Sequence, residues 1–292
     1  MNGTITFSQA DGVWQGRDAQ GIIQVTSKDQ DRVRRVLKKR MEEQAQAQGT
    51  ESDTQSQWPI NQRFDFLSQL VGMVGRGTAV SLIVTGPGGL GKTHTVREGL
   101  LAAGLKEATV EGVNGEGTFK IIKGYSTAKG LYRELYQNQD SVLVFDDCDD
   151  VLKDATALNL LKGALDSYDR RIISWNADMR DDDLERSFQF NGRVIFISNL
   201  NRDRMDVALK TRAYCVDLAM SLSQKIERME KMSQDEDFMP RASRAHKADA
   251  LALIQELGSR CREVSLRTLQ AVTRIRSAGG AWRELAEYTL TN

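Results

Sequence analysis

The sequence predicts an α/β fold in which helices cover a parallel sheet, and three observations support this prediction. Apolar, β-branched stretches of strand length occur at Ala79–Thr85, Ser141–Asp147 and Arg193–Asn199. Stretches with helical periodicity separate them, and such alternation is typical of a parallel sheet. A glycine-rich turn joins the first of these strands to the helix that follows it.

The glycine-rich turn, residues 86–93, reads Gly-Pro-Gly-Gly-Leu-Gly-Lys-Thr and matches the P-loop (Walker A) pattern G-x-x-x-x-G-K-[ST] at every fixed position. Glycines let backbone N–H groups approach phosphate oxygens, and the start of the following helix adds partial positive charge. We expect Lys92 to reach the β- and γ-phosphates of a nucleoside triphosphate and the Thr93 hydroxyl to ligate Mg²⁺. The flanking strand and helix disfavour the alternative, an accidental Gly-Lys-Thr in an ordinary turn. The predicted nucleotide-binding residues here are Gly86, Pro87, Gly88, Gly89, Leu90, Gly91, Lys92, Thr93 and His94.

The second apolar strand ends in two carboxylates, Asp146 and Asp147. In P-loop nucleoside triphosphatases such a strand lies beside the P-loop strand, and its terminal aspartate holds Mg²⁺. This predicts that Asp146 binds the metal and that Asp147 orients and activates the attacking water. The alternative is a strand followed by an acidic turn, since Asp149 and Asp150 continue the run.

Three polar residues further along the chain are candidates for contacts with the γ-phosphate. Asn199 ends the third strand, where ligands bind in open α/β sheets, although Ser-Asn also suits a turn. Arg212 ends a short predicted helix and could stabilise transition-state charge in a neighbouring subunit, or complement the helix dipole. Arg202 and Arg204 are nearby competitors for that role. Arg267 lies in the first turn of a helix, where a cation is disfavoured, so ATP phosphate or a surface salt bridge is its expected partner.

The order of these motifs resembles that of the AAA+ ATPase family over about residues 58–280. Asn199 stands where the family has its first sensor, Thr211-Arg212 resembles the Ser-Arg finger of the clamp-loader branch, and Ser265-Leu266-Arg267 resembles the second sensor. The resemblance implies a parallel five-stranded αβα core with a small helical lid, and ATP hydrolysis with Mg²⁺ as cofactor. It also implies a ring homo-oligomer, expected to be a hexamer, with ATP between subunits.

Three parts are predicted along the chain: an N-terminal extension at 1–57, an ATPase core at 58–218 and a helical lid at 219–292. The extension carries short strands, a helix beginning near Gln30, and a polar stretch at 43–57 that is typical of a linker. Helical periodicity alone follows from the start of the lid.

One feature departs from the pattern of most family members, and one segment resembles an insertion found in some branches. The second acidic position is Asp147, where most members have glutamate, and the shorter side chain predicts slow hydrolysis. Residues 172–190 form an insertion whose two ends are predicted strands, similar to the pore-facing hairpin of some AAA+ branches.

Nucleic acid is the expected macromolecular target. The segment 28–40 is rich in basic residues, and DNA could contact it or the pore-facing segment 172–190. The other interpretation of 28–40 is a solvated helix face packed through Val33, Val36 and Leu37. We therefore expect a motor or switch of the kind used in replication or recombination. The alternatives are a protein-remodelling chaperone and a P-loop kinase, the latter disfavoured because the arginines fall at ring-interface and lid positions.

Composition sets further bounds. The 40 Lys and Arg residues balance 40 Asp and Glu residues, so no global charge favours nucleic acid or a membrane surface. Three scattered cysteines predict neither a disulfide framework nor a zinc site, and favour a reducing compartment. Without a signal peptide or an apolar run of about 20 residues, a cytoplasmic protein is expected. Its size suits a phage or plasmid accessory ATPase, which would act in the host cytoplasm.

Overall fold

The computed structural model describes residues 4–8, 12–17, 23–36, 56–108, 115–124, 127–176 and 184–292. The chain divides into two compact units, Met1–Gln55 and Ser56–Asn292. The first carries a small antiparallel sheet, and the second carries a parallel sheet and the C-terminal helices. The finer division of the second unit into a core and a separate lid domain stays a prediction.

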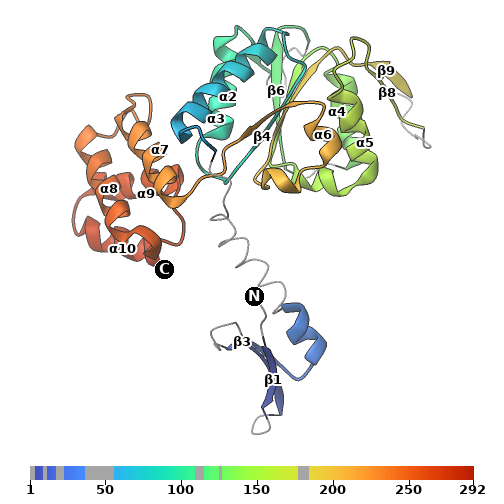
Figure 1. Ribbon diagram of the computed structural model, residues 1–292. Helices are drawn as coiled ribbons and strands as arrows, with labels where there is room; N and C mark the ends of the chain where they lie inside the picture. The colour runs from blue at the N-terminus through green and yellow to red at the C-terminus, as the bar shows by residue number, and fades with distance from the viewer. Residues whose placement is uncertain are drawn as a thin grey trace. The chain divides into compact units, whose positions relative to one another are not determined.

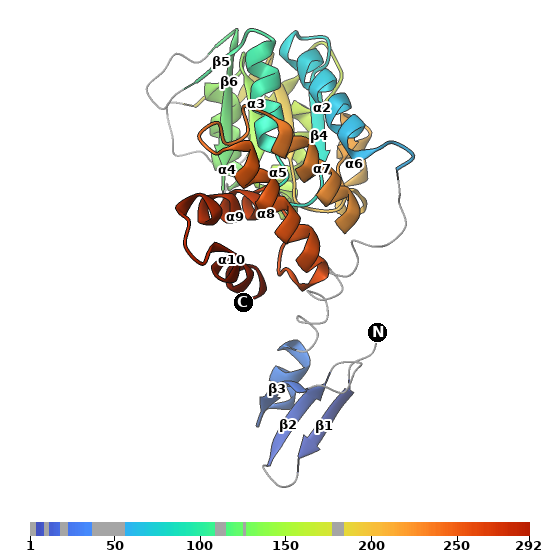
Figure 2. The same ribbon diagram turned by 90° about the vertical axis from the view of Figure 1, so that its left-hand side faces the viewer.

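The N-terminal unit is a three-stranded antiparallel sheet followed by a short helix (Figure 2). Its strands are β1 (Thr4–Ser8), β2 (Val13–Arg17) and β3 (Ile23–Ser27), paired in the order β1-β2-β3. The helix occupies residues 30–36, and Val33 is fully buried. The rest of the predicted basic helix, residues 37–40, and most of the predicted linker lie outside the described residues.

The second unit is built on a six-stranded sheet in the order β11-β4-β10-β7-β6-β5, and all its neighbouring strands run parallel. Its strands are β4 (Ser81–Thr85), β5 (Lys106–Glu107), β6 (Thr118–Lys123), β7 (Val142–Asp146), β10 (Arg193–Ile197) and β11 (Tyr214–Asp217). The predicted parallel α/β fold is confirmed. The sheet has six strands, one more than the predicted five. The additional strand, β5, has only two residues, Lys and Glu, which carry no apolar strand pattern.

Helices cover both faces of this sheet (Figure 1). The helices α2 (Ile60–Gly75) and α3 (Lys92–Ala102) lie on one face, and α4 (Ala128–Gln137) and α5 (Ala155–Ala164) lie on the other. Successive strand residues point to opposite faces. Leu82 and Val84 therefore pack into the core beneath α2 and α3, whereas Ile83 packs into the core beneath α4 and α5.

The C-terminal part is helical, with a hydrophobic core of its own. Its helices are α7 (Leu222–Gln234), α8 (Arg244–Leu257), α9 (Leu266–Ala278) and α10 (Trp282–Thr291), and we call them the lid helices. Arg63 of α2 anchors the segment that leads into them, because its Nη1 donates to the carbonyls of Asp217 (3.1 Å) and Ala219 (2.7 Å). No helix in the described part of the chain has the length and apolar character needed to cross a membrane.

The insertion at 172–190 contains the two predicted strands. β8 (Ile172–Ser174) and β9 (Ser187–Gln189) pair antiparallel, and residues 177–183 between them lie outside the described residues. The hairpin is held against α4 by aromatic contacts, since the ring centroid of Phe188 lies 5.4 Å from that of Tyr132 and 5.3 Å from that of Tyr136. Edge-to-face pairs of this kind stabilise a contact beyond the area that they bury.

Substitution of Gly192 should destabilise the protein by about 2 kcal/mol, because overpacking at an unyielding contact carries a cost of this size. A Cβ atom at Gly192 would lie 2.5 Å from the backbone carbonyl oxygen of Ser141, at the start of β10. Gly163 of α5 is the matched control, since a Cβ there would meet nothing within 4 Å. We expect Gly192→Ala to lower Tm in thermal unfolding and Gly163→Ala to leave it unchanged or raise it; equal melting of the two variants would contradict this packing.

Candidate functional site

The P-loop connects β4 to α3, and its shape requires glycine at two positions in particular. Gly91 is the N-cap of α3 with φ 95°, and Gly86 has φ 136°. Residues with a side chain are strained at such angles. A Cβ at Gly86 would also lie 2.8 Å from the backbone of Leu218, so the loop and the end of β11 are in direct contact. The backbone thus turns tightly and opens the N-terminus of α3 toward a ligand.

Lys92 is folded onto its own loop. Its Nζ donates to the carbonyls of Gly86 (2.5 Å) and Pro87 (2.9 Å) and to Oδ1 of Asn199 (2.8 Å). The side chain is buried, and this burial lowers the pKa of Lys92 to about 8, although the nearby carboxylates of Asp147 and Asp146 act in the opposite direction. A phosphate group that reaches this ammonium would stabilise its charged form.

Thr93 and Asp146 meet at the first turn of α3. The Thr93 hydroxyl lies 3.0 Å from each carboxylate oxygen of Asp146, which is buried at the end of β7. Mg²⁺ is usually held by one or two protein oxygen ligands together with substrate phosphates and water. One hydroxyl and one carboxylate fit an ion that arrives with a nucleotide, and the described residues contain no larger cluster of metal-ligating side chains.

Asn199 lies between the lysine and the second carboxylate. Its Nδ2 donates to Oδ1 of Asp147 at 2.5 Å, while its Oδ1 accepts from Lys92. Asp147 has a positive φ of 57°, which is uncommon for a residue with a side chain, and its backbone N–H donates to the carbonyl of Ile197 (3.2 Å). Asn199 and Asp147, predicted from two separate strand ends, are therefore brought together beside the P-loop.

The lid helices close the site from the other side. The backbone N–H of Leu266 at the start of α9 donates to the carbonyl of Gly89 (2.9 Å), so the lid touches the P-loop directly. Between them lies a cavity of about 420 Å³, lined by the P-loop, His94, Asp146, Asp147, Asn199 and several lid residues. Arg267 lines this cavity, is exposed, and forms no ion pair with a described residue. The alternative prediction, a surface salt bridge of Arg267, thus finds no partner among the described residues.

Sequence reasoning missed Arg228, a buried arginine of α7 that lines the same cavity. Its guanidinium carbon lies 3.8 Å from the centroid of the Phe64 ring, and its Nη1 donates to Oδ1 of Asn61 (3.3 Å). Burial lowers the pKa of Arg228 to about 10. The available signal is its position four residues before the buried Met232, which puts a cation on the apolar side of a lid helix.

Sequence reasoning also missed the contribution of the loop after α7. Asp235, Asp237, Phe238 and Met239 line the cavity and give it both acidic and apolar surface. Buried Lys247 holds this loop, because its Nζ donates to the carbonyls of Asp235 (2.8 Å) and Phe238 (3.0 Å). No sequence motif marks the loop, since its place at the cavity follows from the packing of α8 against α7.

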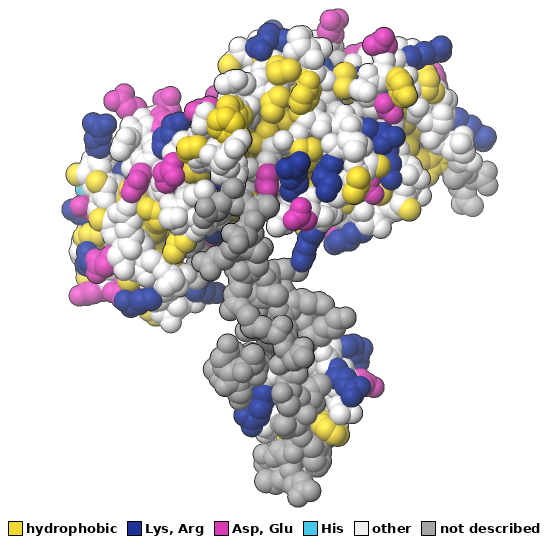
Figure 3. Space-filling model, in the orientation of Figure 1, with side chains coloured by type: hydrophobic (Ala, Val, Ile, Leu, Met, Phe, Trp, Pro, Cys, Tyr) yellow, Lys and Arg dark blue, Asp and Glu magenta, His cyan; other side chains and the backbone are white. Residues whose placement is uncertain are grey.

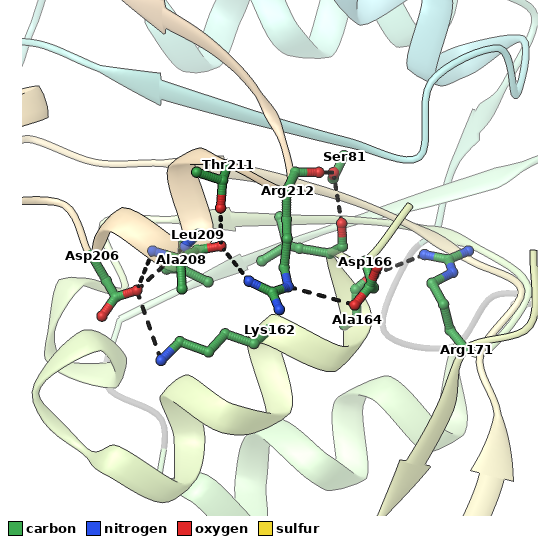
Figure 4. Close-up of polar contacts among 11 residues, drawn as sticks. Ser81, Lys162, Ala164, Asp166, Arg171, Asp206, Ala208, Leu209, Thr211 and Arg212 are labelled. Carbon is green, nitrogen blue, oxygen red and sulfur yellow. Dashed lines mark hydrogen bonds and ion pairs between the residues drawn. The ribbon is translucent and has the colours of Figure 1, made fainter. Parts of the chain in front are cut away.

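Arg212 does not line the cavity of its own chain. Its Nη1 donates to the carbonyl of Ala208 (2.9 Å), and its Nε lies 3.5 Å from a carboxylate oxygen of Asp166 (Figure 4). It follows the short helix α6 (Val207–Lys210), which is preceded by a 3₁₀ turn with exposed Arg202 and Arg204. Lys and Arg side chains gather on this surface, over α6 and α5 (Figure 3).

The strand order and the site together define a class of protein. The P-loop strand β4 lies between β11 and β10, the strand that ends in Asp146 follows next, and lid helices line the same cavity. This is the arrangement of a AAA+ P-loop ATPase. No protein-family model matches the chain. The chain belongs to the family of the uncharacterized 36.7 kDa protein of the nrdC-mobD intergenic region of Enterobacteria phage T4, with 31% identity over 246 residues, which are 78% of this chain and 73% of that protein.

Solved structures with a similar chain include NtrX from Brucella abortus and PCH-2 from C. elegans, each 13% identical in sequence. NtrX in complex with ATP matches with a TM-score of 0.47 over 85% of this chain and 56% of NtrX, and NtrX in complex with ADP with 0.41 over 89% and 55%. PCH-2 matches with a TM-score of 0.37 over 80% of this chain and 66% of PCH-2. The chain thus spans little more than half the length of NtrX.

The lowered pKa of Lys92 predicts a pH dependence for nucleotide binding. Above about pH 8 the unbound lysine loses its proton, and bound phosphates restore it, so binding takes up a proton. We expect the affinity for ADP to fall about tenfold from about pH 7 to about pH 9. Calorimetry in two buffers of different ionisation enthalpy measures the uptake directly. If the affinity for ADP stays constant over this pH range and no proton is taken up, a contact between Lys92 and the bound phosphates is contradicted.

Proposed function

We propose that the protein binds ATP with Mg²⁺ in this cavity and hydrolyses it to drive work on a macromolecule. The observation that supports this most directly is the convergence of Lys92, Thr93, Asp146 and Asp147 with the lid residue Arg267 around one cavity. The P-loop backbone would hold the phosphates, and Thr93 with Asp146 would hold the metal. Arg267 supplies a positive charge from the lid side.

Hydrolysis would use Asp147 and Asn199 together. The carboxylate of Asp147 is the expected partner of the attacking water, and the amide of Asn199 holds this carboxylate in one orientation. A water between them and the γ-phosphate could then attack in line. Because Asp147 is one methylene shorter than glutamate, we propose that turnover is slow without a partner.

The arginine finger requires a second subunit. Arg212 cannot serve the cavity of its own chain while it is bound to Ala208 and Asp166 on another surface. We propose that subunits assemble in a ring, with six as the expected number, in which Arg212 meets the γ-phosphate of a neighbour. Exposed Val207 and Tyr214 on the same surface would lie in that interface.

Nucleic acid is the proposed target of this activity. The basic segment 28–40, described up to residue 36, and the hairpin in 172–190 are the proposed contacts. The relative in phage T4 agrees with a phage accessory protein that acts in the host cytoplasm. Remodelling of other proteins by the same ATPase core is the other outcome that the test below distinguishes.

The proposed function is tested by the ATPase rate with single-stranded DNA, double-stranded DNA, unfolded protein or no polymer, with mass by light scattering in each nucleotide state. We expect a ring-sized particle stimulated by DNA, loss of nucleotide binding in Lys92→Ala, and retained binding without turnover in Asp147→Asn. Stimulation by unfolded protein alone would favour remodelling. A monomer under every condition, with or without ATP, would contradict the shared site and favour a kinase.

The finger is tested by complementation between subunits. Arg212→Ala should keep ATP binding and lose at least about tenfold in turnover, since removal of an arginine finger is expected to slow phosphoryl transfer strongly. Mixed with Lys92→Ala subunits, it should regain part of the activity, because each variant supplies the residue that the other lacks. Parallel substitutions of Arg202 and Arg204, the competing candidates, show which of the three arginines acts as the finger. A mixture that stays inactive although both variants assemble would exclude an arginine that acts between subunits.

A further inference from the structure

A lysine on the strand beside the metal-binding aspartate is not explained by the site described above. Lys123 ends β6, and the register of β6 and β7 sets it directly opposite Asp146. Its Nζ lies 3.2 Å from Oδ2 of Asp146. The two side chains differ in environment, since that of Lys123 is 66% exposed and that of Asp146 is 6% exposed. A long side chain on an exposed strand end can leave this contact at little cost in packing.

The carboxylate of Asp146 therefore has two partners of different kinds. Thr93 offers a neutral hydroxyl, and Lys123 offers a full positive charge. Mg²⁺ bound to the same carboxylate would stand within a few ångströms of the ammonium, and two cations at that distance repel each other. The ammonium and the metal thus compete for one buried anion.

Without a cation, Asp146 would oppose the entry of a nucleotide. Phosphates held by the P-loop come close to Asp146 and to Asp147, and like charges in a partly buried site are screened weakly. The ammonium of Lys123, which also lines the cavity, offsets one of these two charges.

We propose that Lys123 is an exchangeable counter-ion for Asp146: it neutralises this carboxylate when the site holds no metal, and Mg²⁺ displaces it. This inference rests on the proposed binding of Mg²⁺ and nucleotide at the P-loop. The exchange sets how strongly metal and nucleotide depend on each other, because the lysine supports nucleotide binding without the metal and weakens metal binding.

Loss of the Lys123 charge is therefore expected to change the coupling between Mg²⁺ and ADP rather than to lower the affinity for ADP under all conditions. If Lys123 is made neutral, Asp146 loses this counter-ion, and ADP without metal binds less tightly. Mg²⁺ then binds without a competitor, so ADP with Mg²⁺ binds about as tightly as before or more so. The ratio of the two dissociation constants measures this coupling, and a variant that merely perturbs the fold would move both constants together.

The experiment is calorimetric titration of ADP into the full chain, in EDTA and in excess Mg²⁺. We expect the ratio of Kd in EDTA to Kd in Mg²⁺ to rise at least about fivefold in Lys123→Gln and in Lys123→Met, within the usual range of coupling between ligands. Lys123→Arg keeps the charge and should stay within about twofold of the wild type.

Lys120 provides the matched control. It lies on the same strand and pairs with Glu134 of α4 at 2.8 Å, but it does not line the cavity. Lys120→Gln should leave the ratio unchanged, and melting curves of all variants should show that each is folded. An unchanged ratio in both neutral variants of Lys123, or an equal change in Lys120→Gln, would overturn the inference while leaving the proposed function intact. Absence of ADP binding by the folded wild type would overturn the proposed function, and this inference with it.

Discussion

The site depends on the register of three parallel strands. Ile197 of β10 lies opposite Val84 of β4 on one side and opposite Asp146 of β7 on the other. The three strands therefore end at the same level, and the residues after them, which come from three distant parts of the sequence, meet at one edge of the sheet. Because side chains alternate with a period of two, a slip of one residue in β7 would turn Asp146 away from Thr93.

Charge in this site is balanced through shared polar contacts. Lys92 is buried, and three acceptors offset the loss of its hydration. Asn199 extends this set to Asp147, so that a cation and an anion are linked through one neutral amide. Groups held in this way lose little conformational freedom when a ligand binds, so the site is preorganised.

The sequence was sufficient for those parts of the site that a local pattern determines. The P-loop has a fixed spacing, and the strand that ends in Asp146 and Asp147 is recognised by its apolar run. The prediction that this strand lies beside the P-loop strand is wrong, because β10 lies between β7 and β4, but Thr93 and Asp146 still meet at the edge of the sheet. Lys123 could not be found in this way, and the helical spacing of Arg228 does not by itself place that residue at the cavity. Their positions follow from how the lid helices pack and how β6 is registered, and the pairing of distant elements is not encoded in any short segment. The roles of all the predicted site residues stay predictions, those of Asn199, Arg212 and Arg267 as much as those of the P-loop and the two aspartates.

The contacts of Arg63 have a mechanical consequence for the lid. They fix the chain at Asp217 and Ala219, immediately before α7, while the far end of α7 carries the loop that lines the cavity. The helix runs for about 20 Å, given its 13 residues and the rise of an α-helix. Along that length it is also tied to α2, because Arg228 stacks over Phe64 and Nζ of Lys231 lies 3.4 Å from Oδ1 of Asp65. The first lid helix is therefore braced against the core from before its first turn to its last, and the loop that it carries to the cavity is positioned from the core.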